Sequence, residues 1–108
     1  MRFDITHRDN LEPVSIAPGI TARRFPSGPD GAAVLQVDFT AGAKWPSLDV
    51  HDHPEIIFVQ SGNFHDGTRI HGEGTYIYGH PGSEHYPQSA TGCRLLVILP
   101  NGDAAAAA

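Results

Sequence analysis

The feature that most constrains the fold is the division of the chain into short apolar segments by glycines and prolines. The sequence has 12 glycines and 9 prolines. Between them, β-branched and aromatic residues gather in the segments 20–25, 32–40, 55–62, 72–82 and 93–100. Helical periodicity is weak in all of them. Short apolar segments at about ten-residue spacing are typical of an antiparallel sandwich or barrel, so the sequence predicts an all-β fold.

Two segments show how these strands should lie. Successive side chains of a strand point to opposite faces, so in segment 32–40 we expect Gln36 on one face and Leu35 and Val37 on the other. The last segment, CRLLVILP at 93–100, is continuously apolar. That pattern is typical of a strand buried on both faces.

Composition excludes several classes of partner. The net charge is -5, with only 7 lysines and arginines, which argues against nucleic acid or an anionic membrane surface. No apolar run approaches the roughly 20 residues that a bilayer span needs, and the N-terminus shows no signal-peptide core. The single cysteine, Cys93, excludes an internal disulfide and fits a reducing compartment. We therefore expect a cytoplasmic location.

The length of 108 residues suits one domain with one modest core. We expect a single domain over 1–108, with its core at about 20–100 and an N-terminal arm at 1–19. The alanine-rich tail at 104–108 is expected to be disordered.

Two polar motifs point to chemistry, DVHDHPE at 49–55 and HPGSEH at 80–85. His51 and His53 stand two apart, so on a strand both would project to the same side. Glu55 begins the next strand segment, and His85 follows a tight PGS turn. Imidazole and carboxylate groups together suit a divalent transition ion such as Zn, Fe, Ni or Mn. We therefore predict a metal site formed by His51, His53, Glu55 and His85.

The same motifs resemble those of the cupin superfamily. The second cupin motif is echoed by Gly74, five residues, then HPGSEH. The end of the first motif is echoed by Glu55 and Gly62, which six residues separate. Further likeness to the cupin domain of ChrR-type anti-sigma factors and related stand-alone cupins lies in GNFHD, GTYIY, GSEH and GC, over about residues 32–99. The resemblance implies a double-stranded β-helix, or jelly-roll barrel.

One ligand position stays open between two registers. His53 and Glu55 are separated by one residue, whereas the cupin motif has three or four there. With nothing deleted, the motif falls on Asp49, His51 and Glu55, and an aspartate replaces His53. Positions i and i+4 of a straight strand lie ~13 Å apart, so either set requires a bend near Pro54. We favour His53, because imidazole is the commoner ligand.

The resemblance implies three alternative functions. The first is a small metalloenzyme, such as a dioxygenase for a diketone-like or phenol-like substrate or an isomerase, whose catalytic residues the sequence does not name. The second is a non-catalytic regulatory cupin that senses zinc or a metabolite. The third is a structural barrel without metal. By analogy we expect a small-molecule ligand in the barrel and a homodimer.

Other polar residues receive weaker predictions. We expect His80 at the rim of the site, and His65 and His71 at the exposed surface. Arg69 and Arg94 are candidate cations for an acidic ligand, although solvated surface positions are the simpler expectation.

Overall fold

The computed structural model describes residues 2–28 and 31–102. Within this part of the chain, twelve short strands and one 3-10 turn, η1 at Arg8–Asn10, make up the regular structure. The strands are β1 Val14–Ala17, β2 Ile20–Arg24, β3 Ala33–Phe39, β4 Ala43–Lys44, β5 Asp49–Val50, β6 Glu55–Gly62, β7 Phe64–His65, β8 Ile70–His71, β9 Tyr76–Gly79, β10 Glu84–His85, β11 Gln88–Ser89 and β12 Cys93–Leu99. The predicted all-β class is confirmed.

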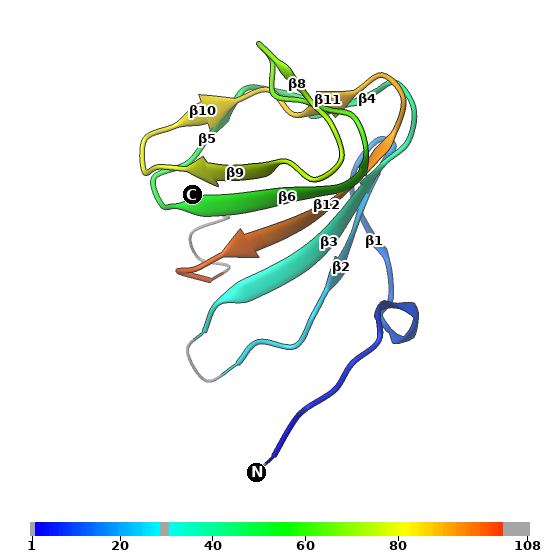
Figure 1. Ribbon diagram of the computed structural model, residues 1–108, viewed down its shortest axis with the longest axis vertical. Coiled ribbons are helices and arrows are strands. Elements are labelled where there is room, and N and C mark those ends of the chain that lie inside the picture. Colours follow the sequence, from blue (N-terminus) through cyan, green and yellow to red (C-terminus); the bar gives the residue numbers. More distant parts are fainter. Residues whose placement is uncertain (1, 29–30, 103–108) are drawn as a thin grey trace.

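A six-stranded antiparallel sheet forms one layer, in the order β1-β2-β3-β12-β6-β9. Its centre is β12, which pairs along its whole length with β3 and over most of it with β6. The second layer consists of a four-stranded sheet, β4-β11-β7-β8, and the pair β10-β5. Figure 1 shows these short strands gathered along the β9 side of the large sheet. The chain therefore forms a two-layer β-sandwich with its apolar residues between the layers.

The core lies between these layers. Among its members, Ile20, Val59 and Phe64 are at most 1% exposed. Gly62 closes β6 with φ +74, and a Cβ there would collide with the carbonyl oxygen of Gly92. Because only glycine fits this left-handed position so close to another backbone, Gly62 fixes the path from β6 to β7.

The structure confirms the main predicted strands. Leu35 and Val37 face the interior, while Gln36 bonds Gln60 on the other face, with 3.4 Å between Gln36 Nε2 and Gln60 Oε1. β12 differs from its prediction, because only alternate residues are fully buried and the others lie half-buried on the outer face. The apolar run therefore does not mark full burial on both faces.

Several strands could not be predicted from the sequence pattern. β4, β5, β10 and β11 have two residues each, too few to show a period. β1 lies within the predicted arm and pairs with β2. The alanine-rich tail predicted at 104–108 lies outside the described residues. Across the described residues, no helix is both long and apolar enough to span a membrane.

Candidate metal centre

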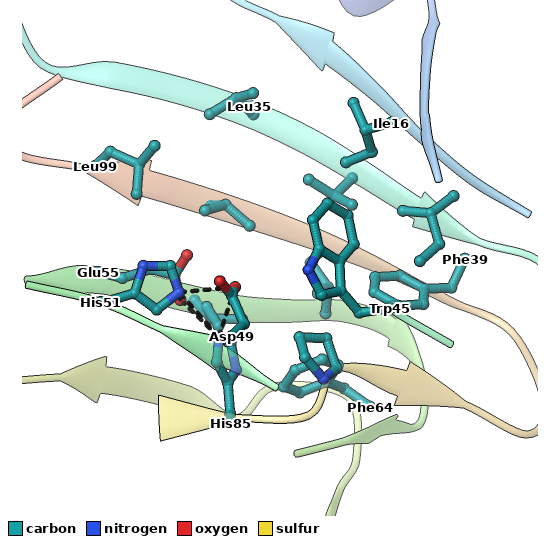
Figure 2. Close-up of a pocket in the computed structure, with 16 residues that line it drawn as sticks. Ile16, Leu35, Phe39, Trp45, Asp49, His51, Glu55, Phe64, His85 and Leu99 are labelled. Carbon is teal, nitrogen blue, oxygen red and sulfur yellow. Dashed lines mark hydrogen bonds and ion pairs between the residues drawn. The ribbon is translucent and has the colours of Figure 1, made fainter. Parts of the chain in front are cut away.

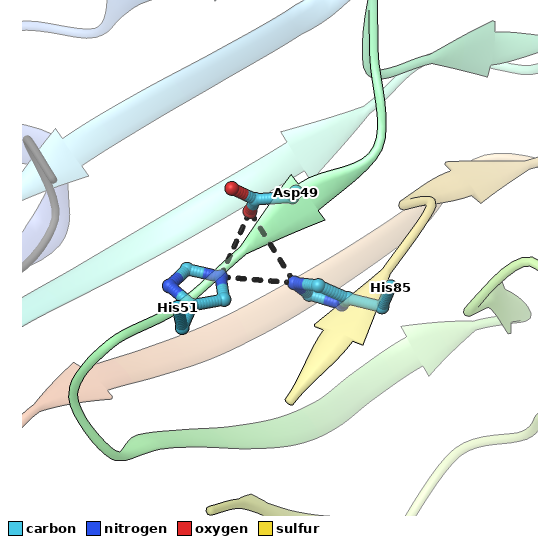
Figure 3. Close-up of side chains that lie close together, drawn as sticks. All are labelled: Asp49, His51 and His85. Carbon is cyan, nitrogen blue, oxygen red and sulfur yellow. Dashed lines mark hydrogen bonds and ion pairs between the residues drawn. The ribbon is translucent and has the colours of Figure 1, made fainter. Parts of the chain in front are cut away.

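Four side-chain atoms converge on one point between the two layers, with Glu55 from β6 of the large sheet and Asp49 and His85 from the β5–β10 pair. His51 Nε2 lies 2.9 Å from Asp49 Oδ2 and 3.4 Å from Glu55 Oε1. His85 Nε2 lies 3.3 Å from Asp49 Oδ2 and 3.4 Å from Glu55 Oε1. The two imidazole nitrogens are 3.1 Å apart. We call Asp49, His51, Glu55 and His85 the central cluster; Figure 3 shows three of its members pointing toward one another.

Backbone pairing between distant segments builds the cluster. In the β5–β10 pair, Asp49 stands directly opposite His85. His51 is fixed to the turn before β10, because its N–H donates to the Ser83 carbonyl at 3.0 Å and its own carbonyl accepts from Gly82 N at 2.7 Å. This pairing holds two of the cluster's segments together before any ion is considered.

A bend carries the chain from β5 into β6. Residues 52–53 form this bend, and Glu55 follows as the first residue of β6, paired with Gly79. The bend turns His53 away from the cluster, and its Nδ1 lies 3.1 Å from Asn101 Nδ2 instead. The structure therefore brings together three predicted site residues, His51, Glu55 and His85, with Asp49 in place of His53.

The charges of the cluster are coupled. Burial acts to raise the pKa of Asp49, but hydrogen bonds to His51 and His85 outweigh it and hold that pKa well below its usual range. The hydrogen bond to Asp49 raises the pKa of His51 against the opposing effect of burial. Burial also raises the pKa of Glu55, although both histidines partly offset it. Two carboxylates and two imidazoles with such interdependent protonation suit a site that exchanges protons for a cation.

The donor set fits a divalent transition ion. Nitrogen and oxygen ligands about 2.0–2.2 Å from one ion, in tetrahedral arrangement, lie about 3.3 Å or slightly more from each other. The measured separations of 2.9 to 3.4 Å are close to that spacing. Two imidazoles with one or two carboxylates are also a combination that such ions favour. Asp49, His51 and His85 therefore form a candidate metal-binding group, and Glu55 Oε1 lies 3.4 Å from Nε2 of both histidines.

An apolar cavity of about 170 Å³ lies on one side of the cluster. Figure 2 shows Trp45, Phe39, Leu35 and Leu99 around it, with the cluster at one side. Apart from Asp49, His51, Glu55 and His85, all lining residues are apolar: Ile16, Ile20, Leu35, Val37, Phe39, Trp45, Ile57, Phe64, Pro87, Leu95, Val97 and Leu99. We call this space the apolar cavity. It can hold an apolar ligand whose polar end meets the cluster.

A second cavity, of about 230 Å³, lies against the other side of the same cluster. It shares His51, Glu55 and His85 with the apolar cavity. Its own lining is more polar and comprises Asp66, Thr68, Ile77, Tyr78, Gly79, Ser83 and Glu84, besides the shared Ile57 and Phe64. We call it the polar cavity. The cluster thus borders both an apolar and a more polar cavity.

The other polar residues lie elsewhere. Arg94 pairs with Asp38 on the outer face of the large sheet, at 2.7 Å from Nε to Oδ1, and Arg69 is exposed. His71 is half-buried and bonds Asp66, with 2.7 Å between Nε2 and Oδ2. The predicted exposure of His71 is therefore wrong. The dipeptide Asp66-Gly67, typical of a hairpin turn, was the signal in the sequence that could have revealed this pair.

Comparison with known proteins places the fold. The sequence model of the ChrR Cupin-like domain family matches residues 2–101. Among solved structures, an RmlC-like cupin from Shewanella frigidimarina superposes with TM-score 0.78 at 20% identity, covering 91% of this chain and 90% of that one. A search of curated proteins gave no match.

Two further solved structures of similar fold belong to proteins with different roles. The anti-sigma factor ChrR of Rhodobacter sphaeroides, solved in complex with SigE, has TM-score 0.74 at 21% identity, with 86% of this chain and 50% of that chain covered. A provisionally assigned acetylacetone dioxygenase from Methylibium petroleiphilum has TM-score 0.78 at 15% identity, with coverage of 92% and 77%. At these identities the likeness establishes the fold alone. With the family match spanning nearly the whole chain, this protein is a cupin of the ChrR Cupin-like domain family.

Proposed function

We propose that the protein is a metal-binding cupin whose central cluster holds one divalent transition ion, Zn, Fe, Ni or Mn, and which acts as a small metalloenzyme on a small organic substrate. One observation carries the proposal: four donor atoms from three chain segments meet at the side of an apolar cavity. In the proposed set, Asp49, His51, Glu55 and His85 are the ligands. The earlier prediction of His53 as a ligand would require its imidazole to leave Asn101.

The central cluster and the apolar cavity have different roles in the proposed function. When bound, such an ion supplies a Lewis acid or a redox centre with open coordination positions. The apolar walls orient the body of the substrate and exclude water from it. Asp49, with its lowered pKa, stays ionised and holds the His51 and His85 rings by accepting hydrogen bonds from them in the metal-free protein.

Oxidative cleavage of a diketone-like or phenol-like compound is the reaction that we propose first. Its support is the apolar cavity, which suits such substrates, and the likeness in fold to the provisionally assigned acetylacetone dioxygenase. Iron would be the ion for this reaction, since O₂ chemistry requires a redox-active metal.

A regulatory cupin is the second candidate. The family match to the ChrR Cupin-like domain favours it, because the ChrR protein is an anti-sigma factor solved with its sigma factor. In that case zinc would occupy the cluster and no turnover would follow. The cytoplasmic location and the homodimer stay predictions.

Metal analysis tests the proposal. Protein purified without chelators should contain about one equivalent of a transition metal. Asp49→Ala should lower the metal affinity at least about 100-fold, beyond the roughly 10–100-fold loss typical of an outer hydrogen-bond partner. His53→Ala is the matched control and should retain the metal. Less than about a tenth of an equivalent in the wild type, or equal loss in both variants, would contradict the proposed site.

Oxygen uptake separates the two functions. Iron-loaded protein should consume O₂ when acetylacetone or a phenolic ketone is added, and His85→Ala protein should not. Zinc-loaded protein that folds and shows no turnover, together with no uptake in the iron form, would favour the regulatory role.

A further inference from the structure

Neither cavity is lined by a lysine or arginine that could meet an anionic ligand. All seven lysines and arginines lie among the described residues, and none of them lines the apolar or the polar cavity. Arg23 and Arg94 both contact Asp38 on the outer face of the large sheet, while Lys44 and Arg69 are exposed. An acidic ligand in either cavity would therefore lack a partner with a fixed positive charge.

A bound divalent metal would supply little net positive charge. The carboxylates of Asp49 and Glu55 carry two negative charges when ionised, which balances the two positive charges of a divalent ion. The polar cavity adds two further acidic groups, Asp66 and Glu84. Hydrogen bonds from His71 and the backbone outweigh burial and lower the pKa of Asp66 to about 2, so Asp66 is ionised at neutral pH. The acidic groups of the polar cavity thus oppose anions, and the apolar cavity offers an anion no lysine or arginine.

The apolar cavity also limits size and polarity. Its volume of about 170 Å³ is close to that of an engineered apolar cavity, of about 150 Å³, that binds benzene in another protein. A carboxylate placed among Leu35, Val37 and Leu99 without a partner would lose its hydration at a cost of several kcal/mol. A hydroxyl or ketone oxygen costs much less, and the polar groups of that lining are the cluster and the indole N–H of Trp45.

We infer that the site selects uncharged ligands: a neutral molecule with an apolar body of about benzene size and one oxygen-bearing end, with carboxylates of the same size excluded. This selectivity narrows the substrate class of the proposed function. It rests on that function in one respect only, the metal ion that the oxygen of the ligand would contact. The earlier candidates for holding an acidic ligand, Arg69 and Arg94, play no part in it.

Two probes of matched shape test the inference, benzyl alcohol and benzoate. Each is titrated into metal-free and into zinc-loaded protein, and binding is followed by the NMR shifts of Ile, Leu and Val methyl groups. In both forms we expect benzyl alcohol to shift the methyls that line the apolar cavity, such as Ile20, Leu35 and Leu99, and to bind at least tenfold more tightly than benzoate. Benzoate binding equal to or tighter than benzyl alcohol in either form would overturn the inference, as would shifts confined to other methyls.

The two failures can be told apart. If zinc does not bind while metal-free protein still prefers benzyl alcohol, the proposed metal site is wrong and the selectivity stands. If zinc binds and the loaded protein prefers benzoate, the metal site stands and the selectivity is wrong.

A charge placed in the cavity gives a second test. Leu35→Lys puts an ammonium group on the apolar wall and should raise benzoate affinity at least tenfold relative to benzyl alcohol. Leu35→Met, which keeps the wall neutral and similar in volume, should keep the wild-type preference. If folded Leu35→Lys protein still prefers benzyl alcohol to the same degree, the charge of the cavity wall does not set the selectivity. If that variant does not fold, the titration of the wild type decides.

Discussion

Two carboxylate–imidazole groups in this protein both lie beside Phe64, and they differ in the groups that their carboxylate oxygens contact. In the Asp66–His71 pair, Asp66 Oδ1 already accepts N–H groups from Thr68 and Arg69, at 2.7 and 2.8 Å, and Oδ2 meets His71. All its partners come from one hairpin. This carboxylate is satisfied locally and stabilises a turn.

The central cluster, by contrast, draws its members from three segments. Asp49, His85 and Glu55 belong to β5, β10 and β6, and His51 follows β5 directly. Their donor atoms face one another rather than backbone N–H groups. Proximity of an aspartate and a histidine therefore does not itself indicate a metal site; convergence of otherwise unpaired donor atoms does.

The largest difference is expected in metal affinity. His85→Ala should lower zinc affinity at least about 100-fold, because it removes a ligand rather than an outer partner, whereas His71→Ala should change it less than about threefold. Competition with a chromophoric chelator measures both. A similar loss of zinc affinity in the two variants would contradict the distinction between the central cluster and the Asp66–His71 pair.

Phe64 contacts both groups, so its removal should affect the fold that they share. Its ring packs edge-on to His85 and is stacked on His71, with centroids 6.3 and 6.4 Å away. Phe64 is 1% exposed, so Phe64→Ala should cost about 3–5 kcal/mol of unfolding free energy. Phe58→Ala, at a position 38% exposed, should cost much less in the same urea titration. Equal urea midpoints for Phe64→Ala and Phe58→Ala would contradict the placement of Phe64 in the core.

Gly62 offers a test of the backbone that leads into the hairpin. Gly62→Ala should lower the unfolding free energy by roughly 2 kcal/mol or more, because the residue has positive φ and approaches Gly92 closely. Gly74→Ala, with positive φ and open space around its Cβ, should cost about 1 kcal/mol. Thermal unfolding compares the two, and a smaller effect at Gly62 would show that its environment is misassigned.

The smallest effect belongs to the Asp66 pair and depends on pH. The pKa of Asp66 is lowered from 3.8 to about 2 in the folded chain, so its ionised form stabilises the fold. That contribution is full above about pH 4 and is lost as the pH falls through about 2. Asp66→Asn should lower stability at pH 7 by about 1 kcal/mol or less. The difference from the wild type should vanish near pH 2; a constant difference across this range would refute the assignment.

The sequence identified much of this arrangement, for physical reasons that also explain its errors. His51, Glu55 and His85 stood out because their motifs lie beside strands long enough to show a period. Between Asp49 and His53, the sequence favoured His53 only because imidazole is the commoner ligand. The choice depends on the cross-strand pairing of Asp49 with His85, which the sequence does not show. Two-residue strands such as β5 and β10 leave no periodic pattern. The residues around the bend at 52–53 also do not indicate the direction in which the His53 imidazole points.

The most direct test of the central cluster is a crystal structure of metal-loaded protein with anomalous scattering recorded at the metal edge. The account predicts one strong peak about 2.0–2.3 Å from Asp49 Oδ2, His51 Nε2, Glu55 Oε1 and His85 Nε2, with His53 still beside Asn101. A peak ligated by His53 in place of Asp49, or a peak at another position in a fully loaded protein, would contradict it.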